Sequence, residues 1–134
     1  MTTQIFVNFA VKDLDKSVAF FTHLGYSFNA QYTNDDGACM IIDSNIFAML
    51  LREPFFQTFT DKQICDTRTH VEALTALSVD CREKVDELVA KALAAGGRAP
   101  RAPTDYGFMY SHAFEDLDGH CWELVHMTGA PPQG

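Results

Sequence analysis

The stretches Phe6-Val7-Asn8-Phe9-Ala10-Val11 and Leu74-Thr75-Ala76-Leu77-Ser78-Val79 decide the fold, because they are two copies of one pattern. Each is rich in apolar, β-branched or aromatic residues, which is typical of a strand. Each then runs into a helical pattern that a glycine ends. The repeat predicts two strand–helix units whose half-sheets meet and form a cleft.

Composition limits the class of protein. The chain has 134 residues, of which 47% are hydrophobic, and this suits one domain with its own core. A formal net charge of -8 argues against a nucleic-acid or anionic-membrane partner. No apolar run approaches the ~20 residues that span a bilayer. The start Met1-Thr2-Thr3-Gln4 has neither a basic nor an apolar targeting region, so we predict a cytoplasmic protein.

The four cysteines, Cys39, Cys65, Cys81 and Cys121, are scattered along the chain. They form no Cys-x-x-Cys pair, and no His lies at zinc-finger spacing, so neither a redox motif nor a structural zinc site is indicated. The pattern favours buried, reduced thiols.

The first half predicts the order βαβββ. Asp13 is placed to cap a helix over 14–24, and Gly25 is placed to end it in a left-handed conformation. Alternating apolar residues and turn sequences mark the strands. The predicted strands of this half cover 4–11, 26–32, 38–42 and 46–51.

The second half repeats the plan. Asp80 and Glu83 form a predicted capping pair for a helix that Gly96-Gly97 stops. A short edge strand is predicted between the helix and a closing hairpin, with prolines limiting its length. The predicted edge strand covers 98–101, and the hairpin strands cover 108–115 and 120–126.

Residues 53–70 connect the halves and carry Phe55, Phe56 and Phe59. The unusual length predicts a structured crossover whose aromatic side chains either fix it to the core or form a lid over a substrate. The tail with Pro131-Pro132 is predicted to be frayed. We expect a single domain over 1–134, with module one at about 4–52, the crossover at 53–70 and module two at about 71–127.

Two motifs carry a family resemblance: Val11-Lys12-Asp13-Leu14-Asp15-Lys16-Ser17-Val18-Ala19-Phe20-Phe21 with Leu24-Gly25, and Asp116-Leu117-Asp118-Gly119-His120-Cys121-Trp122-Glu123-Leu124. With them the chain resembles the glyoxalase/bleomycin resistance/extradiol dioxygenase superfamily, also called vicinal oxygen chelate proteins. Residues 46–51 and 107–110 look like the branch labelled predicted lactoylglutathione lyase. The resemblance implies an α+β fold, in which two βαβββ modules form a cupped eight-stranded mixed sheet, and a homodimer.

Metal-using members of this superfamily take their ligands from the first and last strands of each module. Where they commonly carry His, this chain has Phe6 and Leu74, and Met49 on the last strand of the first half is no ligand for a hard or borderline metal. Only Glu123 remains, and one carboxylate does not hold a divalent ion against water. We therefore predict no metal ligands and no cofactor, while a divalent metal in a non-standard site stays open.

Glu123 is the candidate catalytic residue, as a general acid or base in an apolar cleft. Its alternative role is a carboxylate that bonds a neighbouring strand or a ligand. His112 is the histidine to test, whereas His126 should point away from Glu123. Sparse polar groups in an apolar cleft suit a small organic molecule. The predicted ligand-binding residues are Phe6, Asn8, Met49, Leu74, Ala76, Tyr110 and His112.

These observations leave the protein's status as an enzyme open. The missing metal ligands favour binding or sequestration of a small organic molecule. The alternative is a lyase or isomerase of the lactoylglutathione lyase type, with Glu123 as proton shuttle and a non-standard metal site to stabilise the enediolate. A third hypothesis is a structural or regulatory dimer whose cleft is filled by Phe6, Met49 and Leu74. A ring-cleaving dioxygenase is the least favoured class, because its iron needs two histidines that are missing.

Overall fold

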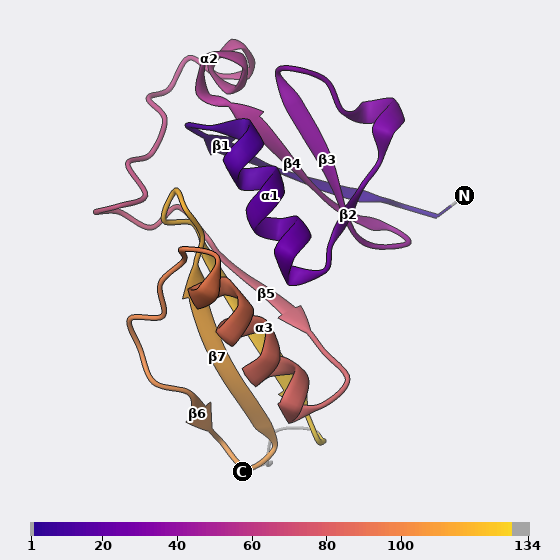
Figure 1. The fold of residues 1–134 in the computed structure, drawn as a ribbon, viewed down its shortest axis with the longest axis vertical. Coiled ribbons are helices and arrows are strands. Elements are labelled where there is room, and N and C mark those ends of the chain that lie inside the picture. The colour runs from indigo at the N-terminus through magenta and orange to yellow at the C-terminus, as the bar shows by residue number, and fades with distance from the viewer. Residues whose placement is uncertain (1, 130–134) are drawn as a thin grey trace. The chain divides into compact units, whose positions relative to one another are not determined.

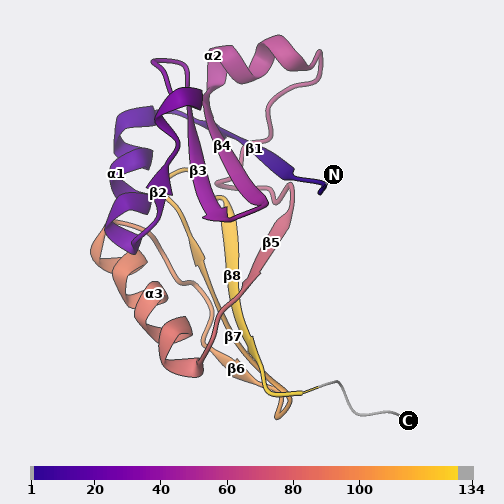
Figure 2. The same ribbon diagram turned by 90° about the vertical axis from the view of Figure 1, so that its right-hand side faces the viewer.

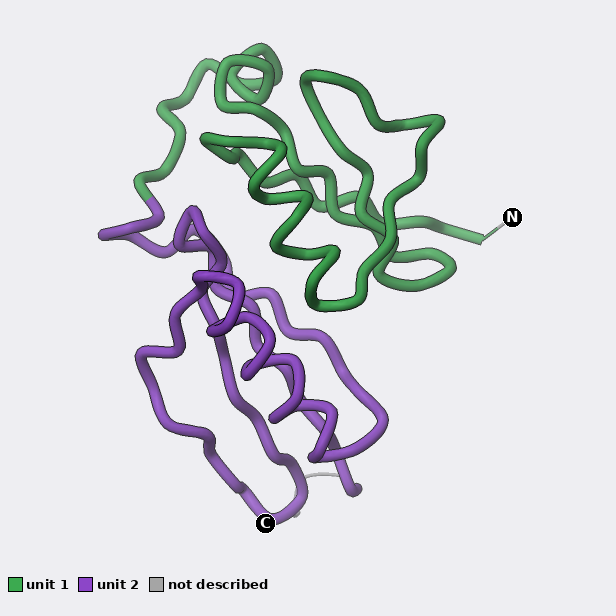
Figure 3. Tube along the Cα trace, in the orientation of Figure 1, with its two compact units in different colours: residues 1–66 green, residues 67–134 purple. Residues whose placement is uncertain are grey.

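The computed structural model describes residues 2–129, which belong to two compact units that divide between Asp66 and Thr67 (Figure 3). The division falls inside the predicted crossover, and the expectation of a single domain stays a prediction. The predicted frayed tail with Pro131-Pro132 lies outside the described residues. Within those residues, no helix has the length and apolarity needed to cross a membrane.

Unit 1 has the predicted βαβββ order. Its four strands form one mixed sheet in the order β1-β4-β3-β2, with β1 parallel to β4 and the other neighbours antiparallel. Its main elements are β1 (Ile5–Val11), α1 (Leu14–Leu24), β2 (Ser27–Phe28), β3 (Gly37–Asp43) and β4 (Ile46–Arg52) (Figure 1).

Helix α1 begins and ends where the sequence predicts. The Asp13 side chain accepts a hydrogen bond from the backbone N–H of Lys16 at 3.1 Å, and Gly25 ends the helix with a φ of 107°. The helix covers one face of the sheet (Figure 2), and its side chains of Phe21 and Leu24 are buried. Full burial of a side chain such as Phe21 is worth about 1.5–3 kcal/mol. The opposite face of the sheet is left for other contacts.

The predicted strand over 26–32 is wrong beyond its first residues. Only Ser27 and Phe28 pair with β3, and the chain then forms the 3-10 turn η1 (Ala30–Tyr32). Asn29 explains the change, because its Oδ1 accepts a hydrogen bond from the backbone N–H of Gln31 at 3.0 Å. Such a local side-chain bond starts a turn and competes with strand pairing.

The crossover begins with two short helices, α2 (Glu53–Phe56) and η2 (Gln57–Phe59). Phe55 is half-buried, and its ring meets that of Phe59 edge to face with centroids 5.2 Å apart. Phe59 itself is 69% exposed. Whether these aromatic residues fix the crossover or act as a lid stays a prediction.

Unit 2 repeats the topology of unit 1, with the strand order β5-β8-β7-β6 and β5 parallel to β8. The α+β class with two βαβββ modules is thereby confirmed, and the eight strands form two four-stranded sheets. One face of the second sheet packs on α3 (Figure 2). The elements are β5 (Leu74–Ser78), α3 (Arg82–Ala94), β6 (Thr104–Asp105), β7 (Met109–Glu115) and β8 (Cys121–Met127).

Two local predictions for unit 2 are wrong. Helix α3 takes Cys81 as its N-cap without a side-chain hydrogen bond, so Asp80 lies one residue too early to cap it. In the predicted edge strand 98–101, only Arg98 forms a bridge, to Glu115, and the paired edge strand is β6. Pro100 supplies no N–H for a ladder inside the predicted strand, which favours pairing after the prolines.

Candidate ligand-binding site

The face of the unit 1 sheet opposite α1 carries the first group of predicted site residues. Phe6 pairs with Phe47 across β1 and β4, and Asn8 pairs with Met49 in the same register. Directly paired residues share a face, and residues two apart along a strand do too. The rings of Phe6 and Phe47 stack with centroids 4.8 Å and planes 12° apart. The structure therefore brings Phe6, Phe47 and Met49 together on one face, and the ligand-binding role of Phe6 and Met49 stays a prediction.

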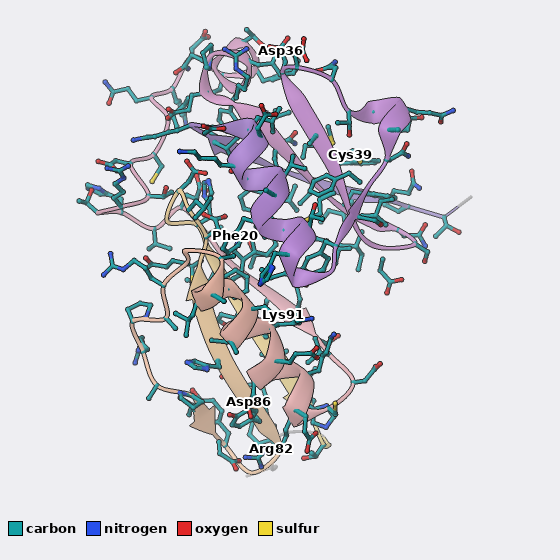
Figure 4. All side chains as sticks on the ribbon, in the orientation of Figure 1. Phe20, Asp36, Cys39, Arg82, Asp86 and Lys91 are labelled. Atoms are coloured by element: carbon teal, nitrogen blue, oxygen red, sulfur yellow. The ribbon has the colours of Figure 1, made fainter. Side chains whose placement is uncertain are left out.

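A cavity of about 440 Å³ lies over this face. Strand residues form its apolar part, and Cys39 on β3 contributes a buried thiol (Figure 4). Burial raises the pKa of this thiol, so it stays protonated at neutral pH. The residues that the structure shows lining the cavity are Gln4, Phe6, Asn29, Tyr32, Cys39, Phe47 and Met49, and none of these is Asp, Glu, Lys, Arg or His.

Local hydrogen bonds fasten the polar side of this cavity to β3. The hydroxyl of Thr33 donates to the backbone oxygen of Asn29 at 2.8 Å and accepts from the N–H of Cys39 at 3.1 Å. Because the Asn29 Oδ1 already accepts from Gln31, its Nδ2 is the group left to donate to a ligand. Asn8, by contrast, is not among the lining residues, and its Nδ2 donates to the Phe6 oxygen at 3.3 Å.

Sequence reasoning missed five of the lining residues, which are Gln4, Asn29, Tyr32, Cys39 and Phe47. Asn29 and Tyr32 reach the cavity because the chain turns at η1 instead of continuing as a strand. An Asn before a short polar stretch was the available signal for this turn. Cys39 could have been found from strand alternation, because it pairs with Met49.

The second group of predicted residues lies on the open face of the unit 2 sheet. Leu74 pairs with Cys121, and Ala76 pairs with Glu123, so the four share one face. Leu74 is 63% exposed and lines a cavity of about 310 Å³ with Arg68, His70 and Cys121 among others. The pKa of Cys121 is raised by burial first and then by nearby carboxylates, Glu123 foremost, so the site does not activate this thiol.

Tyr110 and His112 belong by register to the other face of this sheet. The hydroxyl of Tyr110 donates to Oδ1 of Asp86 on α3 at 2.5 Å, and the Arg82 guanidinium lies 4.3 Å from the centre of its ring. Arg82 and Asp86 project from the same end of α3 (Figure 4). The hydrogen bond to Asp86 is the main reason that the pKa of Tyr110 is raised. The proposed ligand-binding role of Tyr110 stays a prediction, and its hydroxyl is engaged by the protein.

Glu123 and His112 nevertheless line one small polar cavity of about 120 Å³ in unit 2. His112 is held there by its Nε2, which lies 2.9 Å from the backbone oxygen of Arg101. His126 contacts the Val79 oxygen at 3.1 Å through Nδ1 and is not part of this cavity. The other lining residues are Arg101, Ala102, Thr104, Tyr106, Ser111 and Ala113.

The side chains at the expected ligand positions do not fit a divalent metal. Phe6, Met49 and Leu74 offer no nitrogen or oxygen ligand, and Glu123 is a single carboxylate. Across residues 2–129, no three His, Cys, Asp or Glu side chains are grouped so that they could hold a metal ion.

A buried polar cluster supports the start of β8. The Asp116 carboxylate accepts from the backbone N–H groups of Asp118 and His120 and from Nε1 of Trp122, each at 3.0 Å. His120 is also buried, and its Nδ1 lies 2.6 Å from Oε1 of Glu72. The sequence analysis used this motif only as a family resemblance and did not predict the buried cluster. The signal for the cluster was the Asp-x-Asp-Gly turn followed by Trp.

Comparisons with known proteins agree with this geometry. Residues 3–42 match the family model described as Bleomycin resistance protein-like N-terminal. A hypothetical protein from S. aureus is 29% identical, with a TM-score of 0.80 over 94% of this chain and 95% of that chain. A glyoxalase/bleomycin resistance protein/dioxygenase family enzyme from Burkholderia phytofirmans PsJN is 17% identical, with a TM-score of 0.77 over 94% and 99%. The fosfomycin resistance protein FosX from Listeria monocytogenes is 20% identical, with a TM-score of 0.67 over 100% and 96%. No curated protein matches the chain.

The two βαβββ modules give the chain the same fold as these solved structures. Together with the match over the first module, it supports the resemblance of the chain to the glyoxalase/bleomycin resistance/dioxygenase superfamily. The narrower assignment to the predicted lactoylglutathione lyase branch stays a prediction.

Proposed function

We propose that this protein binds a small organic molecule in the cavity of unit 1. The observation that carries the proposal is that cavity itself, of about 440 Å³, with an apolar wall of Phe6, Phe47 and Met49 and an amide from Asn29 at its side. Its volume falls in the range typical of small-molecule sites, as does the mixture of many apolar and few polar groups. At two positions where metal-using relatives carry ligands, Phe6 and Met49 add to this wall instead.

Filling the cavity tests the proposal. Thermal unfolding of the full chain is measured against a panel of aromatic, aliphatic, anionic and cationic small molecules. A ligand at about 100 times its Kd adds about 2.7 kcal/mol to the free energy of unfolding. The variant Met49→Trp places a larger side chain in the cavity, and Met127→Trp makes the same change at an exposed position of β8.

We expect Met127→Trp to retain the stabilisation by any panel ligand and Met49→Trp to lose it. Circular dichroism checks that both variants fold. A ligand that stabilises Met49→Trp as strongly as the unchanged protein, or a panel without any stabilising compound, would contradict binding in this cavity.

A specific observation favours a second candidate, a lyase or isomerase of the glyoxalase type. Glu123 and His112 line the polar cavity of about 120 Å³ together with the hydroxyl-bearing residues Thr104, Tyr106 and Ser111. A carboxylate among hydroxyl groups can move a proton and orient an oxygenated substrate. The test is turnover of the glutathione–methylglyoxal adduct with added nickel, zinc, manganese or cobalt. Activity that disappears in Glu123→Gln would support this candidate, and no turnover with any metal would reject it.

We further propose that the protein is a homodimer and lies in the cytoplasm, as the family resemblance and the sequence suggest. Sedimentation equilibrium of the untagged protein tests the dimer, and cell fractionation tests the location.

A further inference from the structure

The stacked pair of Phe6 and Phe47 places two nearly parallel aromatic rings in the wall of the unit 1 cavity. The β1–β4 register places the two residues side by side, and their rings are tilted by only 12°. Phe6 remains 45% exposed, so the pair is not enclosed by protein. Aromatic rings prefer an offset-stacked or edge-to-face partner at about 4.5–7 Å. A planar ring system gains this interaction on the wall, whereas a puckered saturated ring gains only apolar burial.

The absence of charged side chains among the lining residues of the cavity favours an uncharged ligand. Its seven lining residues include no cation for an anionic ligand and no carboxylate for a cationic one. A charged ligand would lose hydration there without gaining a counter-ion. The formal net charge of -8 adds a long-range penalty for anions.

The polar groups of the cavity are neutral hydrogen-bonding groups. Asn29 presents its Nδ2 donor, and Gln4 presents both a donor and an acceptor. Tyr32, which is 63% exposed, adds a hydroxyl. These groups suit an oxygen or nitrogen atom at the edge of a ligand.

We propose that the cavity of unit 1 selects an uncharged, planar aromatic molecule that stacks on the Phe6–Phe47 pair and bonds the Asn29 amide through a polar edge atom. This inference rests on the proposed function and names the class of ligand for the same site.

Four probes of similar carbon skeleton test separately whether the ligand must be planar and whether it must be uncharged. Naphthol is planar and uncharged, naphthalenesulfonate is an anion, naphthylmethylammonium is a cation, and decalol is the saturated counterpart of naphthol. Their Kd values for the full chain are measured by calorimetry at neutral pH. A second series at high salt screens the net charge of the protein, so that any remaining discrimination belongs to the cavity.

We expect naphthol to bind more tightly than decalol by about twofold to tenfold, which is the range for one aromatic stacking interaction. We expect it to bind more tightly than either ion by about tenfold or more at both salt concentrations. A charged probe or decalol that binds as tightly as naphthol would overturn the inference. If none of the four binds, the inference also falls, and the proposed function survives only if another panel compound binds and Met49→Trp abolishes its binding.

Two matched variants locate the stacking. Phe47→Leu removes a ring but keeps the wall apolar, and Phe59→Leu makes the same change at an exposed residue that does not line the cavity. Naphthol affinity should fall by about twofold to tenfold in Phe47→Leu, decalol affinity should change little, and Phe59→Leu should leave both unchanged. Phe6→Leu repeats the test if Phe47→Leu does not fold. Equal losses of naphthol and decalol binding would contradict stacking.

Discussion

Asp116 and Trp122 are joined by a buried hydrogen bond, in which the indole Nε1 donates to the carboxylate Oδ2 at 3.0 Å. The other carboxylate oxygen accepts two backbone N–H groups from the turn that leads into β8. Burial nevertheless raises the pKa of Asp116 above its ordinary value, against the effect of these bonds and of His120. The cluster therefore holds the turn in place, and its contribution to the free energy of unfolding depends on pH.

The first prediction concerns this pH dependence. An acid whose folded-state pKa is raised contributes stability that is full below its unfolded pKa and is lost as the pH rises through the folded pKa. Asp116→Asn removes the titration and the acceptor for Trp122, which should cost about 1–3 kcal/mol. We expect the difference in the free energy of unfolding between the unchanged protein and Asp116→Asn to grow as the pH falls from neutral towards the pKa that Asp116 has in the unfolded chain. Urea unfolding of both proteins across this range measures it.

Trp122→Phe is the control for that experiment, because it removes the indole donor and keeps the carboxylate. Its pH dependence should keep the sign of that of the unchanged protein and become larger, because the lost indole hydrogen bond lowers the pKa of Asp116. If the difference in the free energy of unfolding between the unchanged protein and Asp116→Asn stays constant or shrinks as the pH falls, a raised pKa of Asp116 is contradicted.

The second prediction separates a steric clash from backbone strain at Gly119. Its φ of 90° disfavours other residues, and an added Cβ would lie 2.5 Å from the backbone oxygen of Thr67. Gly107 has a similar φ of 86° but no atom within 4 Å of an added Cβ. Both alanine variants should therefore lose about 1 kcal/mol from strain, and Gly119→Ala should lose about 1–3 kcal/mol more. Chemical denaturation compares them, and equal losses would show that the Thr67 contact can move without cost.

The third prediction concerns the Phe6–Phe47 pair in the absence of ligand. A double-mutant cycle with Phe6→Leu, Phe47→Leu and the double variant isolates the interaction of the two rings from their separate contacts. We expect a coupling of about 0.5–1.5 kcal/mol in the free energy of unfolding. Strictly additive losses would mean that the stacked arrangement is maintained by the strands alone.

The fourth prediction concerns Tyr110 at the surface of unit 2. Because the Asp86 carboxylate accepts its hydrogen bond, the pKa of Tyr110 is raised, and the stability from this bond is lost as the pH rises through that value. Asp86→Asn should shift the titration of Tyr110 to lower pH, as followed by ultraviolet difference absorbance with Tyr110→Phe as the blank. Glu83→Gln, which removes an exposed carboxylate from the same helix, should leave the titration unchanged. An equal shift in both variants would mean that the net charge of the protein, and not the hydrogen bond to Asp86, raises the pKa of Tyr110.

Much of the fold follows from local sequence. The Asp13 cap and the left-handed Gly25 set the ends of α1, and the apolar repeats over β1 and β5 set the two modules. These features act within a few residues, so the sequence pattern alone reveals them. Where a local side-chain bond overrides a strand pattern, as at Asn29, the prediction fails.

The candidate site was predicted in part. Strand alternation and register account for the shared face of Phe6 and Met49 and for that of Cys121 and Glu123, because side chains alternate with a fixed period of two. Alternation could not reveal that Tyr110 bonds Asp86 on a helix, since that contact joins residues distant in sequence.

The sequence by itself determined the duplicated βαβββ plan, the apolar character of the strand faces and the loss of imidazoles at the expected metal positions. Only the tertiary structure decided that Asn29 and Tyr32 come to line a cavity with Phe6, and that Asp116 is enclosed with Trp122. The physical reason is that periodicity and capping are fixed within one element, whereas a cavity or a buried polar cluster exists only once separate elements pack together.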